Sequence, residues 1–329
     1  MAEPVATVII PNYNGMRYLP RLLESLQRQS EPRLVVSIVD DQSKDESVAY
    51  LREKWPDVRV QVNERNLGFA GTCNAGLRAA TTPFAILLNN DTHVDEHWLA
   101  EGLAGFDRED VGSVASLVLL AEPPHLIDTA GDVYSVVGGA VKRNHLQPRG
   151  TAAALPGDCF SPSGASAFYR REAVMKVGLL DERFESYYED VDLGFRLAWA
   201  GYRCRFAPKS ICFHHLSQSY SPKGWRYHFN SARNAQIVWR ANVPASVRRR
   251  HVVGRTMFLA LQAANKLRQG CLKPYLAGRW AARRHLEHIA EKQSALPVGD
   301  AVAVERVASR LERDWWGLHV GSRFSKATT

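Results

Sequence analysis

The stretch Thr7-Val8-Ile9-Ile10-Pro11-Asn12-Tyr13-Asn14 decides the fold, because an apolar run of mostly β-branched residues ends abruptly in polar ones. Such a run is typical of a strand that is buried on both faces. Leu19, Leu22, Leu23 and Leu26 follow at the spacing of one helix face. The beginning of the chain therefore predicts a buried strand followed by a helix that covers it.

The same alternation continues to about residue 90. Further strands are predicted at 34–39, 58–62 and 83–88, and a helix is predicted at 70–80. Ser43 and Glu46 have the spacing of a capping box, which predicts the beginning of another helix. Strands that alternate with helices indicate an α/β fold with a doubly wound, mostly parallel sheet.

Polar residues follow each of the four predicted strands. They lie at 12–14, 40–41, 63–66 and 89–91. In open α/β sheets, ligands bind outside the carboxyl ends of the strands. The four polar strand ends together therefore predict a site for a nucleotide or a similar ligand.

The rest of the chain is less regular. Residues 120–160 contain Pro and Gly pairs and are expected to form loops that cover this site. A strand is predicted at 164–170, a helix at 187–200, and two short strands at 203–206 and 211–214. From Trp225 onward the chain is predicted to be mostly helical.

Composition indicates a globular chain. Of its 329 residues, 45% are hydrophobic and 23% are charged, and no apolar run approaches the roughly 18 residues of a membrane span. The first apolar stretch is too short for the core of a signal peptide. Five irregularly spaced Cys argue against a disulfide framework. We therefore expect a cytoplasmic protein.

Charge is distributed unevenly along the chain. Residues 221–329 hold 20 Lys and Arg against 6 Asp and Glu, a surplus of +14, whereas the other 220 residues carry −6 of the overall +8. A mildly acidic body with a strongly basic tail predicts a polyanionic partner for the tail, such as membrane lipid, phosphates or nucleic acid.

Asp91 and His214 are candidate metal ligands. Asp91 follows a predicted strand and two Asn, and carboxylate and amide oxygens suit a hard divalent cation. The alternative for Asp91 is a helix N-cap ahead of 96–103. Strand alternation lets only one of His214 and His215 face the site, where a neutral imidazole would serve as a further ligand.

Three carboxylates stand in the run Glu189-Asp190-Val191-Asp192 at the start of a predicted helix. A structural explanation exists, since the helix macrodipole favours them there and Asp192 can pair with Arg196. The functional interpretation is a general base that deprotonates an acceptor hydroxyl. Adjacent helical side chains point about 100° apart, so Glu189 and Asp190 cannot share that role.

Several familiar signatures are absent from the sequence. There is no G-x-x-x-x-G-K-[ST] loop, no G-x-G-x-x-G after the first strand and no G-x-S-x-G elbow. A P-loop enzyme and a dinucleotide dehydrogenase are therefore not expected.

Taken in order, the motifs resemble those of family 2 glycosyltransferases with the GT-A fold, over about residues 5–240. The matching motifs are Val8–Asn14, Ile38–Ser43 with Asp45, Asn66–Gly71 with Asn74, Leu87–Thr92, Gly164-Ala165, Tyr188–Leu193 with Arg196, Ala200–Tyr202 and His214-His215. The similarity is greatest to rhamnosyltransferase-like bacterial members, which act on polyprenyl-linked or cell-envelope glycans.

The resemblance implies an inverting transfer of a sugar, with rhamnose a candidate, from a UDP- or dTDP-sugar to a hydroxyl of a glycan or lipid-linked acceptor. Asp190 matches the general base. Asp91 matches the last acidic position of the metal motif D-x-D, and His214 matches its later ligand, for Mg²⁺ or Mn²⁺. Asn89 replaces the first carboxylate of that motif.

The resemblance also implies where the nucleotide binds. Asp40 would accept the N3–H of a uracil or thymine base, while the other residues would flank the nucleoside or approach the ribose and phosphates. Those other residues are Pro11, Asn12, Tyr13, Asn66 and Asn90.

The implied organisation is a GT-A catalytic domain at 1–224 and a basic helical region at 225–329. The nucleotide-sugar half would span about 1–120 and the acceptor half about 121–224. Apolar and basic residues at helical spacing predict that 225–290 attaches the protein to the inner face of the cell membrane without spanning it. The alternative is that this face packs on the catalytic domain or in a homo-oligomer. No nucleic-acid partner is expected for the catalytic chain.

Two other functions remain open on the sequence. A sugar nucleotidyltransferase would share the sheet but would need a Gly-rich basic loop where 11–14 is polar. A non-catalytic glycan- or nucleotide-binding protein would explain the basic tail but would not need Asp91 and Asp190 together.

Overall fold

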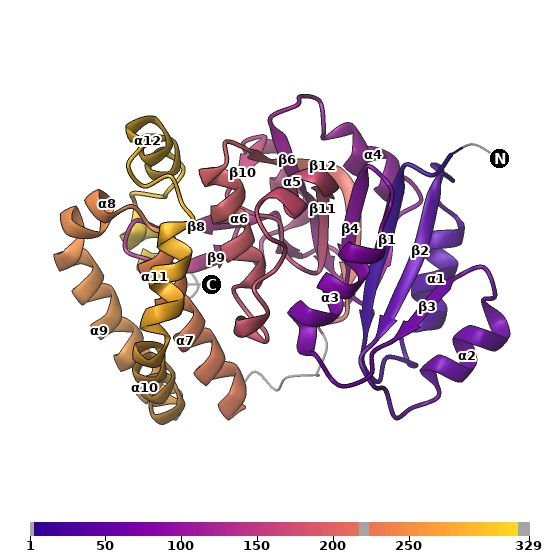
Figure 1. Ribbon diagram of the computed structural model, residues 1–329, viewed down its shortest axis with the longest axis horizontal. Coiled ribbons are helices and arrows are strands. Elements are labelled where there is room, and N and C mark those ends of the chain that lie inside the picture. The colour runs from indigo at the N-terminus through magenta and orange to yellow at the C-terminus, as the bar shows by residue number, and fades with distance from the viewer. Residues whose placement is uncertain (1–2, 217–223, 322–329) are drawn as a thin grey trace.

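The four predicted strands of the first half are confirmed in the computed structural model, which describes residues 3–216 and 224–321. They hydrogen-bond in parallel in the order β4-β1-β2-β3 (Figure 1). Their bounds are β1 (Ala6–Asn12), β2 (Leu34–Asp40), β3 (Arg59–Val62) and β4 (Phe84–Leu88). The carboxyl ends of these strands therefore lie at one edge of the sheet.

Helices cover both faces of this sheet, because successive side chains of β1 are buried on opposite faces. Val8 and Ile10 belong to a core cluster that includes the leucines of α1 (Leu19–Gln27). Ile9 belongs to a second cluster, with Cys73 and Leu77 of α3 (Gly68–Ala79). Both faces of the strand are thus removed from water, which explains its uninterrupted apolar run.

The predicted capping box is wrong. The helix after β2 is α2 (Ser47–Lys54), which begins four residues beyond Ser43 and has no side-chain cap. Ser43 is engaged elsewhere, because its hydroxyl accepts hydrogen bonds from the Asn12 amide at 3.2 Å and the Asn14 N–H at 2.8 Å. The loop between β2 and α2 is therefore shaped by the neighbouring strand end.

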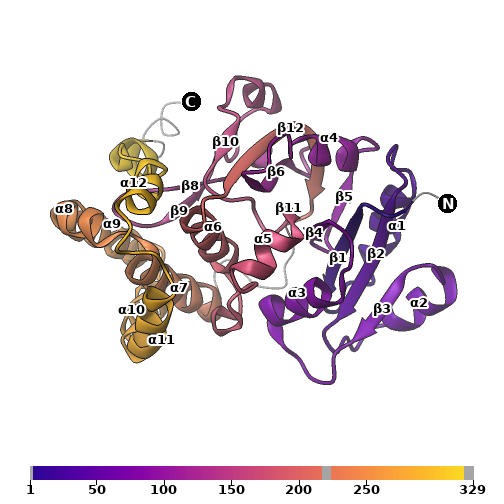
Figure 2. The ribbon, with the colours of Figure 1, turned by 45° about the horizontal axis from the view of Figure 1, so that its top comes forward.

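The sheet continues beyond β4 through a strand that the sequence patterns did not identify, β6 (Val111–Leu120), all of whose residues are buried. The added strands also include β5 (Thr92–Val94), β7 (Ile127–Thr129), β10 (Asp158–Cys159), β11 (Ser166–Arg170) and β12 (Arg203–His214). The main path of neighbours is β10-β12-β6-β11-β4-β1-β2-β3 (Figure 2), and beside it β5 pairs with β12 and β7 with β6. Strands β5, β7, β10 and β11 are antiparallel to the strands with which they pair. The other strands of the sheet run in one direction, so the sheet is mixed but mostly parallel.

Two further expectations need correction. The strands predicted at 203–206 and 211–214 form the single strand β12, with an irregularity between Ala207 and Ile211. The segment 120–160 is more ordered than a set of loops. It contains β7 (Ile127–Thr129), β8 (Asp132–Tyr134), β9 (Ala140–Lys142) and a helical turn at Arg149–Ala154.

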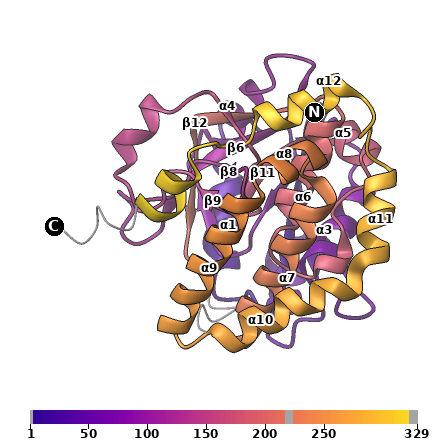
Figure 3. The ribbon, with the colours of Figure 1, turned by 90° about the vertical axis from the view of Figure 1, so that its left-hand side faces the viewer.

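Helices α4 (Trp98–Ala104), α5 (Arg171–Lys176) and α6 (Glu189–Trp199) complete the part before residue 217, with a helical turn at Glu182–Phe184. From Trp225 the described chain is helical, as predicted, and its helices gather on one side of the sheet (Figure 3). They are α7 (Trp225–Asn242), α8 (Ala245–Arg250), α9 (Val252–Arg268), α10 (Leu272–Ala281), α11 (Leu286–Ser294) and α12 (Ala301–Ser309), with helical turns at Ala282–His285 and Gly317–Gly321.

One hydrophobic cluster joins these helices to the rest of the fold. It contains Phe195 of α6 together with Ile237 of α7 and Val307 of α12, all nearly inaccessible to solvent. The indole N–H of Trp199 also donates to the carbonyl of Asn242 at 2.9 Å. A single core therefore crosses the boundary expected near residue 224.

None of the helices within 3–216 and 224–321 is long and apolar enough to cross a bilayer. Large apolar side chains are nevertheless exposed on α9 and α10. They include Val253 (70%) and Met257 (48%) of α9 and Trp280 (56%) and Leu276 (50%) of α10.

Candidate active site

The ends of β1, β2 and β4 are tied together by one side chain, Asn12, which is buried. Its amide nitrogen donates to the Asp40 carboxylate at 2.8 Å, and its amide oxygen accepts from Asn90 at 2.9 Å. Gly15 makes this arrangement possible, because a Cβ there would lie 2.1 Å from the Asn12 oxygen and 2.3 Å from the Asn90 nitrogen. Three of the predicted nucleotide residues are thus brought together.

Asp40 has no exposed surface in this arrangement. One carboxylate oxygen accepts from Asn12, and the other accepts from the N–H of Ser43 at 2.9 Å. Asp40 therefore shapes the strand-end loops. Tyr13, by contrast, is 47% exposed, and Pro11 beside it is half-buried.

Asp41 organises the neighbouring loop. Its carboxylate accepts from the N–H groups of Leu67 and Gly68 at 2.8 and 2.9 Å and from Asn63 at 2.9 Å. The exposed side chain of Asn66 donates to the Asp41 carbonyl at 3.1 Å. Asn66 thus lies at the same edge of the sheet, one strand further from β4 than Asn12.

Asp91 and His214 lie together, as predicted for metal ligands. The His214 Nε2 is 3.3 Å from the Asp91 carboxylate, and its Nδ1 is 3.0 Å from Asp128. His215 turns away and packs on the ring of Tyr18, so one histidine faces the site and the other does not. Helix α4 begins after His97, so the alternative interpretation of Asp91 as an N-cap is wrong.

His214 lies between two carboxylates, Asp91 and Asp128, which make its surroundings acidic. Burial alone would lower the pKa of His214, but hydrogen bonds to Asp128 and Asp91 outweigh it and raise the pKa to about 9. Asp128 is buried, which opposes its ionisation, yet the His214 hydrogen bond and the charge of Lys142, 2.7 Å away, hold its pKa well below the usual range. Asp128 is therefore a negative charge behind the imidazole.

The pair suits a cation that takes few protein ligands. The described residues contain no group of three or more His, Cys, Asp or Glu that could hold a metal. Asp91 and His214 would supply two ligands, and Mg²⁺ commonly leaves its other positions to water and substrate phosphates. A carboxylate on the opposite ring nitrogen, here Asp128, is the usual support of a ligating histidine.

The three carboxylates of the acidic run point in different directions. Asp190 is half-buried and accepts from the N–H of Gly164 at 3.0 Å and of Val191 at 2.8 Å. Glu189 is buried, and one of its oxygens has no hydrogen-bond partner within the described chain. Asp192 pairs with Arg196 at 2.8 Å, as predicted. Only Asp190 combines partial exposure with two N–H donors.

Burial raises the pKa of Asp190, against the opposing effect of its backbone hydrogen bonds. Burial, together with the charge of Asp190, also raises the pKa of Asp132 on β8. The charge of Lys142 lowers the pKa of both carboxyls. Lys142 thus links the proposed base electrostatically to Asp128 and, through it, to the Asp91–His214 pair.

Sequence reasoning missed Asp128, Asp132 and Lys142, because it treated 120–160 as loops. A signal was present in Asp128-Thr129-Ala130-Gly131-Asp132, where two carboxylates four residues apart surround a glycine in an otherwise apolar neighbourhood. The structure shows that β7, β8 and β9 carry these groups and that all three contribute to the site's charge.

The loop before Asp190 is held by α7. Asn234 is fully buried, and its amide nitrogen lies 2.8–3.0 Å from the carbonyls of Phe184, Ser186 and Tyr187. Arg233 donates to Glu185 and to the Phe184 carbonyl. Both residues are therefore committed to positioning this loop. Lys223, another cation near the start of α7, lies outside the described residues.

The mostly parallel sheet, with polar residues at its strand ends, is the arrangement expected for the GT-A fold, and comparison with known proteins agrees. The profile of the Glycosyl transferase family 2 matches residues 7–178, and the chain belongs to that family. Asp190 and His214 lie beyond the matched stretch.

Curated relatives are similar at moderate identity. The O-antigen biosynthesis protein RfbC of Myxococcus xanthus is 29% identical over 226 residues, which cover 66% of this chain and 18% of that protein. An N-acetylglucosaminyl-diphospho-decaprenol L-rhamnosyltransferase of Mycobacterium tuberculosis is 28% identical over 243 residues, covering 65% of this chain and 77% of that protein. The chain spans 53% and 42% of the length of two further glycosyltransferase relatives.

Solved structures agree on the fold. The mannosyltransferase PcManGT from Pyrobaculum calidifontis, solved with GDP-Man and Mn²⁺, superposes with a TM-score of 0.54 at 18% identity. The superposition covers all of this chain and 82% of that one. The GT-A-type fold expected from the resemblance is therefore confirmed.

Proposed function

We propose that the chain transfers a sugar, with rhamnose a candidate, from a UDP- or dTDP-sugar to a hydroxyl of a glycan or lipid-linked acceptor, with inversion at the anomeric carbon. The observation that carries this proposal is Asp190, a half-buried carboxylate fixed by two backbone N–H groups at the start of α6. A relative that is 28% identical acts, by its name, on a sugar linked to decaprenyl diphosphate.

In the proposed reaction, Asp190 accepts the proton of the acceptor hydroxyl as that oxygen attacks the anomeric carbon. The bond from this carbon to the donor diphosphate breaks on the opposite face, so no covalent enzyme intermediate is needed. The raised pKa of Asp190 brings its basicity closer to working pH, which favours general-base catalysis. Gly164 and Val191 fix the carboxylate so that little reorientation is needed.

Asp91 and His214 would hold a divalent cation, which when bound would neutralise the charge developing on the leaving diphosphate. Asp128 would keep the imidazole of His214 oriented. On the nucleoside side, Tyr13 offers an exposed ring to a base. Asn12 and Asn90 would fix the loop edges on either side, with Asp40 behind them.

The basic helices suggest where the enzyme works. Val253, Met257, Leu276 and Trp280 expose apolar surface, and the region carries a large positive charge. Apolar side chains beside Lys and Arg are typical of attachment to an anionic membrane surface. We propose that these helices rest on such a surface, which would bring the site to a lipid-linked acceptor.

A transfer assay with UDP- and dTDP-sugars, Mg²⁺ or Mn²⁺ and a polyprenyl diphosphate-linked sugar tests the proposal. The expected product has an inverted anomeric centre by NMR, and retention would contradict the mechanism. Synthesis of a nucleotide sugar from a nucleoside triphosphate and a sugar 1-phosphate would instead identify a nucleotidyltransferase. Donor binding without any turnover would identify a binding protein.

A further inference from the structure

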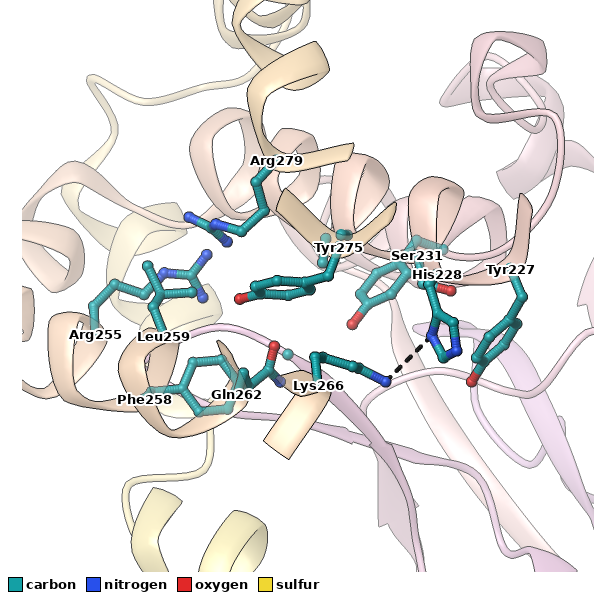
Figure 4. A pocket seen from close by; sticks show the side chains of 14 residues that line it. Tyr227, His228, Ser231, Arg255, Phe258, Leu259, Gln262, Lys266, Tyr275 and Arg279 are labelled. Atoms are coloured by element: carbon teal, nitrogen blue, oxygen red, sulfur yellow. Dashed lines mark hydrogen bonds between the residues drawn. The ribbon is translucent and has the colours of Figure 1, made fainter. Parts of the chain in front are cut away.

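Helices α7, α9 and α10 enclose a cavity of about 120 Å³ beside the turn between β8 and β9 (Figure 4). Its walls carry an unusual number of cationic and aromatic groups. Among them are Tyr188, His228, Arg255, Lys266, Tyr275 and Arg279.

Two arginines share one neutral acceptor in this wall. Arg255, only 5% exposed, donates to Gln236 Oε1 at 2.9 Å and to the Val137 carbonyl at 2.6 Å. Arg279 donates to the same Gln236 oxygen at 2.9 Å. Neither guanidinium forms an ion pair with a carboxylate of the described chain. Two like charges thus converge on a single amide oxygen.

No Asp or Glu of the described residues balances the charge of Arg255 and Arg279 in the cavity wall. No described residue of the lining is an Asp or Glu. The segments outside the description, 1–2, 217–223 and 322–329, contain no Asp or Glu in their sequence either. Burial lowers the pKa of Arg255 to about 10, and the neighbouring charge of Arg279 acts in the same direction. An anion in the cavity would relieve this repulsion.

The buried donors of the wall that have no hydrogen-bond partner within the described residues include the Nε of Arg255 and the Nε2 of His228, whose residues are 5% and 4% exposed. His228 Nδ1 lies 3.3 Å from the Lys266 ammonium and must accept there, so Nε2 carries the proton. Unpartnered buried donors in a native fold call for a ligand or an ion that accepts from them.

The cavity shares one wall residue with the loop that leads to the proposed base, and it borders an apolar surface. Tyr188 forms part of its wall and stands two residues before Asp190. Arg279 also borders a second hollow of about 270 Å³, together with Arg240, Arg283 and Trp280. Cations inside and exposed apolar groups outside suit a phosphate-bearing head attached to an apolar chain.

We propose that this cavity binds the diphosphate of a lipid-linked acceptor, with Arg255, Arg279, Lys266 and His228 as its donors. The inference rests on the proposed function only in assigning the diphosphate to the acceptor. The cavity itself is defined by its own residues. Tyr188 would then connect acceptor binding to the loop that carries the base.

Calorimetric titration of the full chain with inorganic pyrophosphate, in EDTA and without nucleotide, tests the anion site. Arg279→Gln should weaken binding about tenfold or more, the effect of losing one charge-assisted hydrogen bond. Arg268→Gln is the matched control, because Arg268 is exposed on α9 and outside the lining. Lys266→Met is the second variant if Arg279→Gln does not fold. Unchanged binding in the cavity variants, or equal loss in the control, overturns the proposal.

Farnesyl diphosphate distinguishes a lipid-borne diphosphate from a free one. It should bind more tightly than pyrophosphate, and Trp280→Ser should remove the gain, because the exposed indole would contact the apolar chain. Equal affinity of the two probes would overturn the assignment to a lipid.

Kinetics separate this inference from the proposed function. Arg279→Gln should raise KM for a diphosphate-linked acceptor without changing kcat, and should leave KM unchanged for an alkyl glycoside of the same sugar. Equal effects on both acceptors would overturn the acceptor assignment. The wild-type chain could transfer no donor sugar at all while Arg279→Gln still weakens pyrophosphate binding. In that case the proposed function is wrong and the anion site is retained.

Discussion

Replacing Asn234 by Ala tests how the loop before the proposed base is held. Its amide nitrogen has two hydrogens for the three carbonyls at 2.8–3.0 Å, so about two buried hydrogen bonds are lost. Leaving buried carbonyls unsatisfied costs about 1–3 kcal/mol each. Glu185, Tyr187 and Tyr188 have φ of 64°, 72° and 73°, which costs roughly 1–2 kcal/mol per residue. Relaxation of this strain offsets part of the loss.

The net expectation is a decrease of about 2 kcal/mol in the free energy of unfolding. Transfer should slow by about tenfold or more, because the loop leads directly into Asp190. Urea denaturation and steady-state kinetics measure the two effects. Asn265→Ala on α9 is the control, since the side chain of Asn265 makes no hydrogen bond within the described residues and Ala favours a helix. If Asn234→Ala changes neither the free energy of unfolding nor kcat, Asn234 does not hold this loop.

Three further outcomes are expected. Asp91→Ala should weaken donor binding and abolish the response of activity to added Mg²⁺ or Mn²⁺, whereas full wild-type activity in excess EDTA would exclude the metal. Asp181 contacts His288 and Lys292 at 2.6 and 2.9 Å, and these hydrogen bonds and the Lys292 charge lower its pKa despite burial. Its contribution to stability is therefore complete above the unfolded pKa of about 4 and is lost as pH falls through the lower folded pKa. In urea denaturation, Asp181→Asn should therefore lose less stability on acidification than the wild type. The full chain should float with anionic vesicles at low salt and be released at about 1 M salt, where the Debye length is about 3 Å. The variant Trp280→Ser should float less. Absence of flotation at low salt would refute membrane attachment.

Local patterns predicted the nucleotide-side half because each of its strands is a short buried run followed by polar residues. Asn12 and Asn90 could be placed at one edge of the sheet from strand order alone. Strand order alone could not predict the hydrogen bond between them or the complete burial of Asp40. These features depend on the missing Cβ of Gly15 and on the loop around Ser43.

The acceptor side was less predictable because its contacts join segments distant in sequence. Asp128 reaches His214 across 86 positions, and Asn234 reaches the carbonyl of Tyr187 across 47. Strand β6 is buried throughout and has no alternation that distinguishes it from a helix of the core. A basic composition indicated a polyanionic partner, but only the packing of α7, α9 and α10 showed a cavity that gathers cations.

Activity of Asp190→Asn tests the central claim most directly. Loss of a general base should lower kcat roughly 10²–10⁴-fold, while the donor, which we propose binds at the other strand ends, should keep its affinity within about twofold. Glu189→Gln is the matched control, because Glu189 is buried next to Asp190 without facing the same partners, and its effect should be milder. A kcat for Asp190→Asn within about threefold of wild type would contradict the assignment of Asp190 as the base.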